Sequence, residues 1–224
     1  MLSPAETEAL LLSLRVAAVA VAAALPFAFA TALLLARARF PGKLLLDAII
    51  HLPLVLPPVA LGFLLLAVLG TRAGLGAFLA DHFGIRLVFR WTGAALASAI
   101  LTFPFQVRAI RLVLEARGQG LNAAAASLGA GPWDRLFSIT LPLAGPGILA
   151  GAITAFAASL GEFGAIITFV SSIPGETRTL PLAIYSALQQ PGGEAEAMRL
   201  AGLSILLALF FMALAQGVSR RWAR

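Results

Sequence analysis

The chain has 224 residues, of which 60% are hydrophobic and only 12% charged, with a formal net charge of +6. So little polar surface cannot cover a water-soluble globule of this length, and the composition places the chain in a membrane. Cysteine is absent, which excludes disulfides, thiolate metal sites and cysteine nucleophiles.

Five apolar stretches are long enough to cross about 30 Å of hydrocarbon as helices, which takes roughly 20 residues each. In chain order they cover residues 9–36, 44–70, 93–114, 143–170 and 199–218. The interval 177–190 is short and lies among prolines, so it is predicted to be a re-entrant or interfacial helix, with a sixth span as the alternative. The predicted fold is all-α: one domain, residues 1–224, forming a polytopic membrane protein of five or six transmembrane helices.

Basic residues follow every second predicted span. They are Arg37, Arg39 and Lys43 after the first, Arg111, Arg117 and Arg135 after the third, and Arg220, Arg221 and Arg224 after the fifth. Cytoplasmic loops are enriched in Lys and Arg, so these ends are predicted to face the cytoplasm, with the N-terminus outside and the C-terminus inside. The same distribution argues against a nucleic-acid partner, because the charges do not form one face of a soluble module.

Three prolines interrupt the second predicted span, at Pro53, Pro57 and Pro58. Each removes a backbone donor, so the helix must break or kink within the membrane. Transporters use such discontinuous helices to line a pathway, which makes Pro57 and Pro58 candidates for a translocation path or gate. A simple packing kink is the alternative.

Polar side chains form a stripe on the third predicted span. Ser98, Thr102 and Gln106 are spaced four residues apart, which places them on one helix face. The stripe could line a pore, or it could provide hydrogen bonds between packed helices, which is common for Ser and Thr in membranes.

The fourth predicted span carries Thr154, Ser159 and Glu162, and Glu162 is the one carboxylate well inside a predicted span. Intramembrane acids usually have a function. An ionised glutamate would repel any ligand that is itself anionic, and for such a ligand a gate or helix-anchoring role, in which Glu162 accepts hydrogen bonds from the protein, is favoured over direct ligation. A proton relay is the weaker alternative.

The loop of about residues 115–142, between the third and fourth spans, has an unusual pattern. Asn122 is a predicted N-cap, a run of four alanines follows, and Gly129 suits the left-handed position that ends a helix. Pro132 fits the first turn of a second segment, and Pro142 marks entry into the next span. Methyl-sized side chains allow close backbone approach, so this helix is predicted to dock in a groove of another protein.

Motifs for enzyme chemistry are absent from the sequence. The single lysine, Lys43, lacks the glycine loop and hydroxyl residue of a phosphate-binding loop, and His51 and His82 are too sparse for a metal cluster. We therefore predict a chain without catalytic residues, metal or cofactor, whose energy source lies in another protein.

The spacing of Gly129, nine intervening residues and Ile139-x-Leu141-Pro142 resembles the coupling loop of bacterial ABC-transporter permeases. Together with the blocks Leu52 to Gly62, Phe103 to Ala109 and Ser159 to Pro181, it resembles the molybdate permeases, within the molybdate and sulfate permease group. The resemblance covers nearly the whole chain. One difference is that the loop's customary glutamate, at the position of Asn122 or Ala123, is missing.

The resemblance implies a type I importer permease in the bacterial inner membrane, which moves a tetrahedral oxyanion by alternating access. The substrate would be molybdate, or tungstate, with a sulfate or thiosulfate permease as the alternative. The implied partners are a second copy of the chain, a dimer of cytoplasmic ATP-binding subunits, an extracytoplasmic oxyanion-binding protein and membrane lipid. A scaffold that recruits a cytoplasmic partner without transport is the alternative from another class. The residues expected to couple to the ATPase are Asn122, Ala123, Ala124, Ala125, Ala126, Gly129, Ala130, Trp133, Ile139, Leu141 and Pro142.

Overall fold

The computed structural model describes residues 2–71, 74–117 and 119–222, and all regular structure in this part of the chain is helical. Four helical stretches there are long and apolar enough to cross a membrane, and a bent pair of helices raises the number to five. The four are Pro4–Arg37, Trp91–Ala116, Pro132–Leu160 and Glu194–Leu214. The predicted all-α polytopic membrane fold is confirmed, with four to five candidate spans in the described part of the chain.

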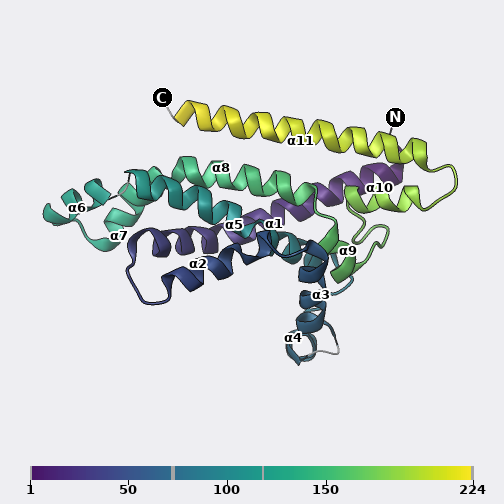
Figure 1. The fold of residues 1–224 in the computed structure, drawn as a ribbon, viewed down its shortest axis with the longest axis horizontal. Helices are drawn as coiled ribbons and strands as arrows, with labels where there is room; N and C mark the ends of the chain where they lie inside the picture. The colour runs from purple at the N-terminus through teal and green to yellow at the C-terminus, as the bar shows by residue number, and fades with distance from the viewer. Residues whose placement is uncertain (1, 72–73, 118, 223–224) are drawn as a thin grey trace.

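The bundle is built on α1 (Pro4–Arg37), α5 (Trp91–Arg117), α8 (Leu141–Leu160) and α11 (Glu194–Trp222), which run side by side along the long axis of the molecule (Figure 1). Small residues allow this close packing. A Cβ atom added to Gly147 of α8 would lie 2.7 Å from the backbone oxygen of Ala109 in α5. In a membrane, where lipid tails are as apolar as leucine, such close contacts supply much of the helix association.

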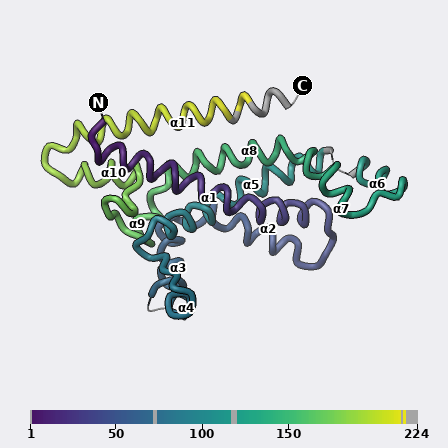
Figure 2. The backbone as a smooth tube through the Cα atoms, turned by 180° about the vertical axis from the view of Figure 1, so that it is seen from behind, coloured from purple at the N-terminus to yellow at the C-terminus, as the bar shows by residue number. Residues whose placement is uncertain are grey.

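The second predicted span is broken at its prolines, as expected. It consists of α2 (Lys43–His51), a 3₁₀ turn at Leu52–Leu54 and α3 (Pro58–Leu69), and the two parts meet at 108°. Pro58 occupies the first turn of α3, where its missing N–H costs nothing. Figures 1 and 2 show α3 and the following α4 (Gly74–Phe83) extending away from the bundle as an arm.

The fourth predicted span begins and ends earlier than expected, which corrects the range 143–170 to Pro132–Leu160. Helix α8 ends at Leu160, and a separate short helix, α9 (Gly164–Val170), begins after a break. Glu162 lies in this break rather than inside a continuous span. The average hydropathy of the stretch hides the break, because the apolar residues on both sides outweigh Gly161, Glu162 and Gly164.

The interval 177–190 contains α10 (Leu180–Leu188), whose nine residues are too few to cross a bilayer. This leaves five as the largest number of spans in the described part of the chain.

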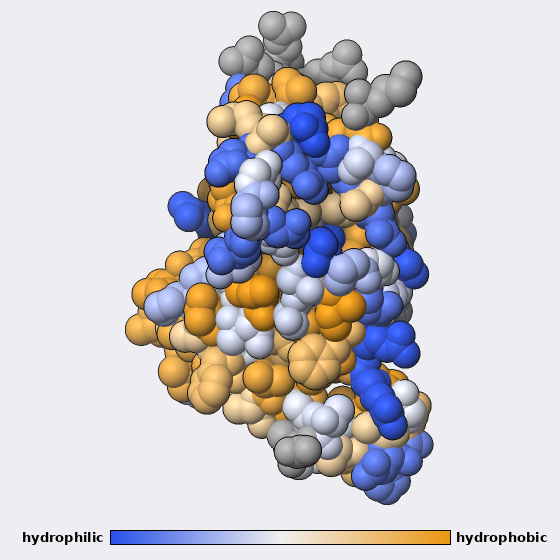
Figure 3. Space-filling model, turned by 90° about the vertical axis from the view of Figure 1, so that its right-hand side faces the viewer, coloured by the Kyte–Doolittle hydropathy of each residue, from blue (hydrophilic) through white to orange (hydrophobic). Residues whose placement is uncertain are grey.

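The two ends of the bundle differ. One end, here called the coupling end, carries α6 (Gln119–Ser127) and α7 (Pro132–Arg135) beside the last turn of α1. The other end carries the start of α1, α10 and the start of α11, and hydrophilic side chains gather across it (Figure 3). Helix α11 runs from the end that carries the start of α1 back toward the coupling end (Figure 1). Of the basic clusters, Arg224 and the side chains of Arg117, Arg220 and Arg221 lie outside what the structure describes.

Candidate functional site

Helix α6 contains the alanine run and ends as the sequence predicts. Gly129 adopts the left-handed conformation, with φ of +85°. Its N–H donates to the carbonyl of Ala126 at 3.1 Å, and the N–H of Ala130 donates to the carbonyl of Ala125 at 3.0 Å. This pair of bonds is a Schellman motif, which satisfies the last carbonyls of the helix and fixes the direction in which the chain leaves it.

The predicted N-cap role of Asn122 is wrong. Helix α6 begins at Gln119, so Asn122 lies within it rather than at its start. The sequence suggested a later start because Gly120, a weak helix former, precedes the strong helix formers Ala123 to Ala126. The Asn122 side chain instead accepts a hydrogen bond from Thr140 at 3.4 Å, which ties α6 to the start of the next span.

Thr140 is the centre of a small polar network at the coupling end. Its side chain is completely buried. The guanidinium of Arg37, at the end of α1, donates to the Thr140 hydroxyl at 2.6 Å, and that hydroxyl also lies 3.1 Å from the carbonyl of Arg135. Three elements, α1, α6 and the segment leading into α8, therefore meet at one side chain. The sequence analysis missed Thr140, although it is the variable position within Ile139-x-Leu141-Pro142.

The helix passes from α7 to α8 through one π-helical turn, Leu136–Thr140, in which the N–H of Leu141 donates to the carbonyl of Leu136. Pro142 explains this turn. Proline has no N–H, so the regular i to i−4 ladder is interrupted at this point and the backbone widens locally. Helix α8 begins at Leu141, but the continuous helical stretch starts at Pro132, so Pro142 lies inside the span rather than at its entry.

An exposed apolar surface covers the coupling end. Leu128 is 87% exposed and Trp133 71% exposed, and the Trp133 ring stacks on Phe137 with centroids 6.2 Å apart. Leu121 on α6 is also exposed. Exposed aromatic and leucine side chains in a cluster indicate a protein contact surface. The sequence analysis identified the alanines and Trp133 but gave no docking role to Leu128, Leu121 or Phe137.

A second candidate site lies where α3 crosses α9. A Cβ atom on Gly62 of α3 would lie 2.6 Å from the backbone oxygen of Ala165, and one on Gly164 of α9 would lie 2.9 Å from the Pro58 side chain. Glu162 positions α9, because its Oε1 accepts a hydrogen bond from the N–H of Ala165 at 2.8 Å. The crossing places Pro58 against Gly164, two residues after Glu162, although these two parts of the chain are far apart in the sequence.

The stripe on α5 is buried inside the bundle. The Thr102 hydroxyl donates to the carbonyl of Ser98 at 2.8 Å, and Gln106 Nε2 contacts the carbonyl of Val21 in α1 at 3.5 Å. All three stripe side chains are at most 2% exposed, and Ser159 is also buried, whereas Thr154 is exposed. The stripe therefore lies between packed helices in one copy of the chain, where, among the described residues, only Gln106 hydrogen-bonds to another helix and the Ser98 hydroxyl has no partner.

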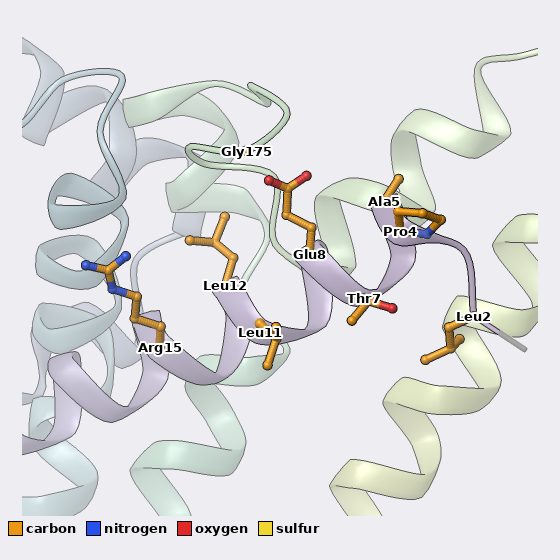
Figure 4. A pocket seen from close by; sticks show the side chains of 9 residues that line it. All are labelled: Leu2, Pro4, Ala5, Thr7, Glu8, Leu11, Leu12, Arg15 and Gly175. Carbon is orange, nitrogen blue, oxygen red and sulfur yellow. The ribbon is translucent and has the colours of Figure 1, made fainter.

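The end opposite the coupling end has a cavity of about 820 Å³ along the first turns of α1 (Figure 4). Glu8 points from α1 toward the loop at Gly175, and Arg15 points outward from α1 further along the helix. The guanidinium carbon of Arg15 lies 3.8 Å from the centre of the Trp91 ring, a cation–π contact that joins α1 to the start of α5. Among the described residues, no group of three or more His, Asp or Glu could hold a metal ion.

Comparison with known proteins agrees with this architecture. The family described as binding-protein-dependent transport system inner membrane component matches residues 15–224. The chain is 54% identical over 220 residues to the molybdenum transport system permease protein ModB of Escherichia coli K12, covering 98% of this chain and 96% of that protein. It is 36% identical over 191 residues to the sulfate transport system permease protein CysT of the same organism, covering 84% and 69%.

The fold also matches a chain in the crystal structure of a bacterial alginate ABC transporter in complex with an alginate pentasaccharide-bound periplasmic protein, with a TM-score of 0.75 at 19% identity. The match covers 99% of this chain and 81% of that one. The bundle of four to five spans and the exposed α6 are consistent with the family match across nearly the whole sequence. The chain therefore belongs to the binding-protein-dependent transport system inner membrane components, the permease subunits of ABC transporters.

Proposed function

We propose that this chain is the transmembrane subunit of an ATP-driven importer for molybdate, with tungstate as a second substrate. The observation that supports molybdate most directly is the greater similarity to a molybdenum permease, over nearly the full length of both chains, than to a sulfate permease. A sulfate or thiosulfate permease is the second candidate, because the sulfate permease is also similar over most of this chain.

Coupling to ATP hydrolysis takes place through α6 and the turn that follows it. The alanines allow close approach to a groove on an ATP-binding subunit, and the exposed Leu128 and Trp133 supply apolar contact area. The Schellman motif at Gly129 and the contacts of Thr140 hold α6 against α1 and α8, so that a displacement of α6 moves the ends of both helices. The chain thus acts as a permease without its own catalytic residues.

Two copies of the chain form the pathway between them. A dianion cannot cross bare hydrocarbon, since even one charged side chain costs roughly 3 kcal/mol on insertion scales, so a polar lining is required. Five helices from one copy leave no such lining, because the polar stripe of α5 is buried. The arm of α3 and α4 leaves the bundle and presents exposed Phe63 and Phe78, which a second copy can cover.

Within this arrangement, the crossing of α3 and α9 acts as the gate. It contains the broken backbone at Pro57 and Pro58 and is adjacent to Glu162 in the break before α9. Thr154 of α8 is exposed and is assigned to the pathway. The coupling end faces the cytoplasm, so the N-terminus lies outside the inner membrane and the C-terminus lies inside. An oxyanion-binding protein delivers the substrate from the outer side.

Transport assays in proteoliposomes test the function. The chain is reconstituted with its ATP-binding subunits, and uptake of radiolabelled molybdate is measured with the binding protein outside and ATP inside. Uptake that requires ATP and is competed by tungstate but not by excess sulfate supports a molybdate importer. Preferential competition by sulfate would assign the chain to the sulfate permeases, and the absence of any ATP-dependent oxyanion uptake would favour the scaffold.

A further inference from the structure

A basic pocket of about 600 Å³ lies at the coupling end, between the end of α1, the start of α2 and α6. Four cationic side chains line it, together with small and amide side chains. The lining residues are Arg37, Arg39, Lys43, Arg135, Ala36, Ala38, Asn122 and Ala123. No carboxylate is among them, and none of the four cations forms an ion pair with a described acidic residue. Four positive charges without a counter-charge indicate a site for an anion.

The pocket lies where the apolar surface of the bundle ends. Leu34, one turn before Arg37 on α1, is 45% exposed. Leu44, directly after Lys43 on α2, is 84% exposed. In a transmembrane protein, such outward leucines contact acyl chains, and the first charges beyond them lie at headgroup depth. The basic pocket is therefore bordered by lipid-facing surface on its membrane side.

We infer that the basic pocket binds the phosphate headgroup of an anionic phospholipid from the inner leaflet. A lipid matches both parts of the surface, because its phosphate meets the four cations and its acyl chains meet the exposed leucines of α1 and α2. Basic pockets between transmembrane helices on the cytoplasmic side are the kind of site that such headgroups occupy. A free oxyanion or an acidic side chain of an ATP-binding subunit would use the cations but leave the leucines without a role.

The basic pocket borders the residues that connect α6 to the bundle. Asn122 and Ala123 of α6 form one wall of the pocket, and Arg37, which holds Thr140, forms another. A bound headgroup would therefore hold the end of α1 and α6 together at the junction through which α6 moves the bundle. Lipid binding itself does not depend on which substrate is transported, so its test is independent of the proposed function.

The test is a titration of the full-length chain with phosphatidylglycerol in detergent micelles, read by native mass spectrometry, with phosphatidylcholine as the neutral reference. The wild-type chain should bind one phosphatidylglycerol more tightly than phosphatidylcholine. The double variant R39Q/K43Q should bind it about 10- to 30-fold more weakly, the effect expected for two cations near an anionic group. The control R86Q/R108Q removes the same charge from two exposed arginines outside the pocket and should keep wild-type affinity.

Three results would overturn the inference. The first is equal loss of phosphatidylglycerol binding in both double variants, which would indicate a general charge effect. The second is binding of inorganic phosphate or molybdate to the wild-type chain without lipid, lost in R39Q/K43Q, which would assign the pocket to a free oxyanion. The third is unchanged lipid binding in R39Q/K43Q combined with loss of the co-purified ATP-binding subunit, which would assign it to a protein partner.

Discussion

The guanidinium of Arg37 donates to the hydroxyl of Thr140 across 2.6 Å, which joins the last residue of α1 to the turn that leads into α8. The two residues are 103 positions apart in the sequence. Because Asn122 of α6 contacts the same hydroxyl, an element on the surface of the bundle is connected to two of its long helices through one buried atom. Mechanical coupling requires such a connection, since force must pass from a docked helix to the spans.

Replacing Thr140 with valine should weaken this connection while leaving the packing volume unchanged. The buried site loses the Thr140 hydroxyl, so Arg37 and Asn122 lose their common partner, and a hydrogen bond to a charged group contributes about 1.5–3 kcal/mol. We expect a lower melting temperature in detergent and ATP hydrolysis that is less tightly linked to uptake. Thr140→Ser keeps the hydroxyl and is the control, and a valine variant with wild-type coupling would contradict the role of Thr140.

Gly129 offers a test of the direction in which the chain leaves α6. No atom lies within 4 Å of a Cβ added at this position, so a substitution there acts through the backbone rather than through a clash. Valine tolerates a φ of +85° poorly, which costs roughly 1–2 kcal/mol, whereas asparagine adopts this conformation more readily.

Gly129→Val should therefore insert normally but uncouple ATP hydrolysis from uptake, and Gly129→Asn should retain most of the coupling. Insertion is checked by the amount of protein in the membrane fraction, and coupling by the ratio of molybdate taken up to ATP hydrolysed. Equal ratios in the valine variant and the wild type would show that the turn does not transmit movement.

Gly62 tests the crossing of α3 and α9. A methyl group there would lie 2.6 Å from the backbone oxygen of Ala165, so the two helices must separate, at a cost of about 1–3 kcal/mol for an overpacked site. Gly62→Ala should reduce uptake and thermal stability together. Gly145→Ala in α8 is the matched control, because nothing lies within 4 Å of its added Cβ and alanine favours the helix. If both variants transport equally well, the crossing is not part of the gate.

Apart from the limits of the fourth span, the sequence was sufficient to predict the spans, the break at the prolines and the left-handed Gly129, because each depends on local chemistry: apolar length, a missing N–H and a missing Cβ. The network at Thr140 could not be predicted, since it joins residues more than 100 positions apart through side-chain geometry. The break at Glu162 was also missed, because hydropathy averages over a window and does not register a turn of three residues. The candidate site was therefore predictable as a surface helix but not as a connected assembly.

Glu162 allows its two suggested roles to be separated. Its Oε1 accepts the N–H of Ala165, which satisfies a backbone donor in the first turn of α9. If this anchoring is its function, Glu162→Gln should transport nearly as well as the wild type, because the amide oxygen can accept the same bond. Glu162→Ala loses the acceptor and should be impaired, with a stability cost of about 0.5–2 kcal/mol, typical of a lost helix cap.

A proton relay makes the opposite prediction for the glutamine variant, since an amide cannot exchange a proton at this position. Initial rates of molybdate uptake in the two variants, measured at equal protein content, distinguish the roles. Inactivity of Glu162→Gln with normal thermal stability would rule out simple anchoring. Anchoring is the outcome we expect, because the break between α8 and α9 leaves the first N–H groups of α9 without helical partners, and the Glu162 carboxylate is positioned to satisfy one of them.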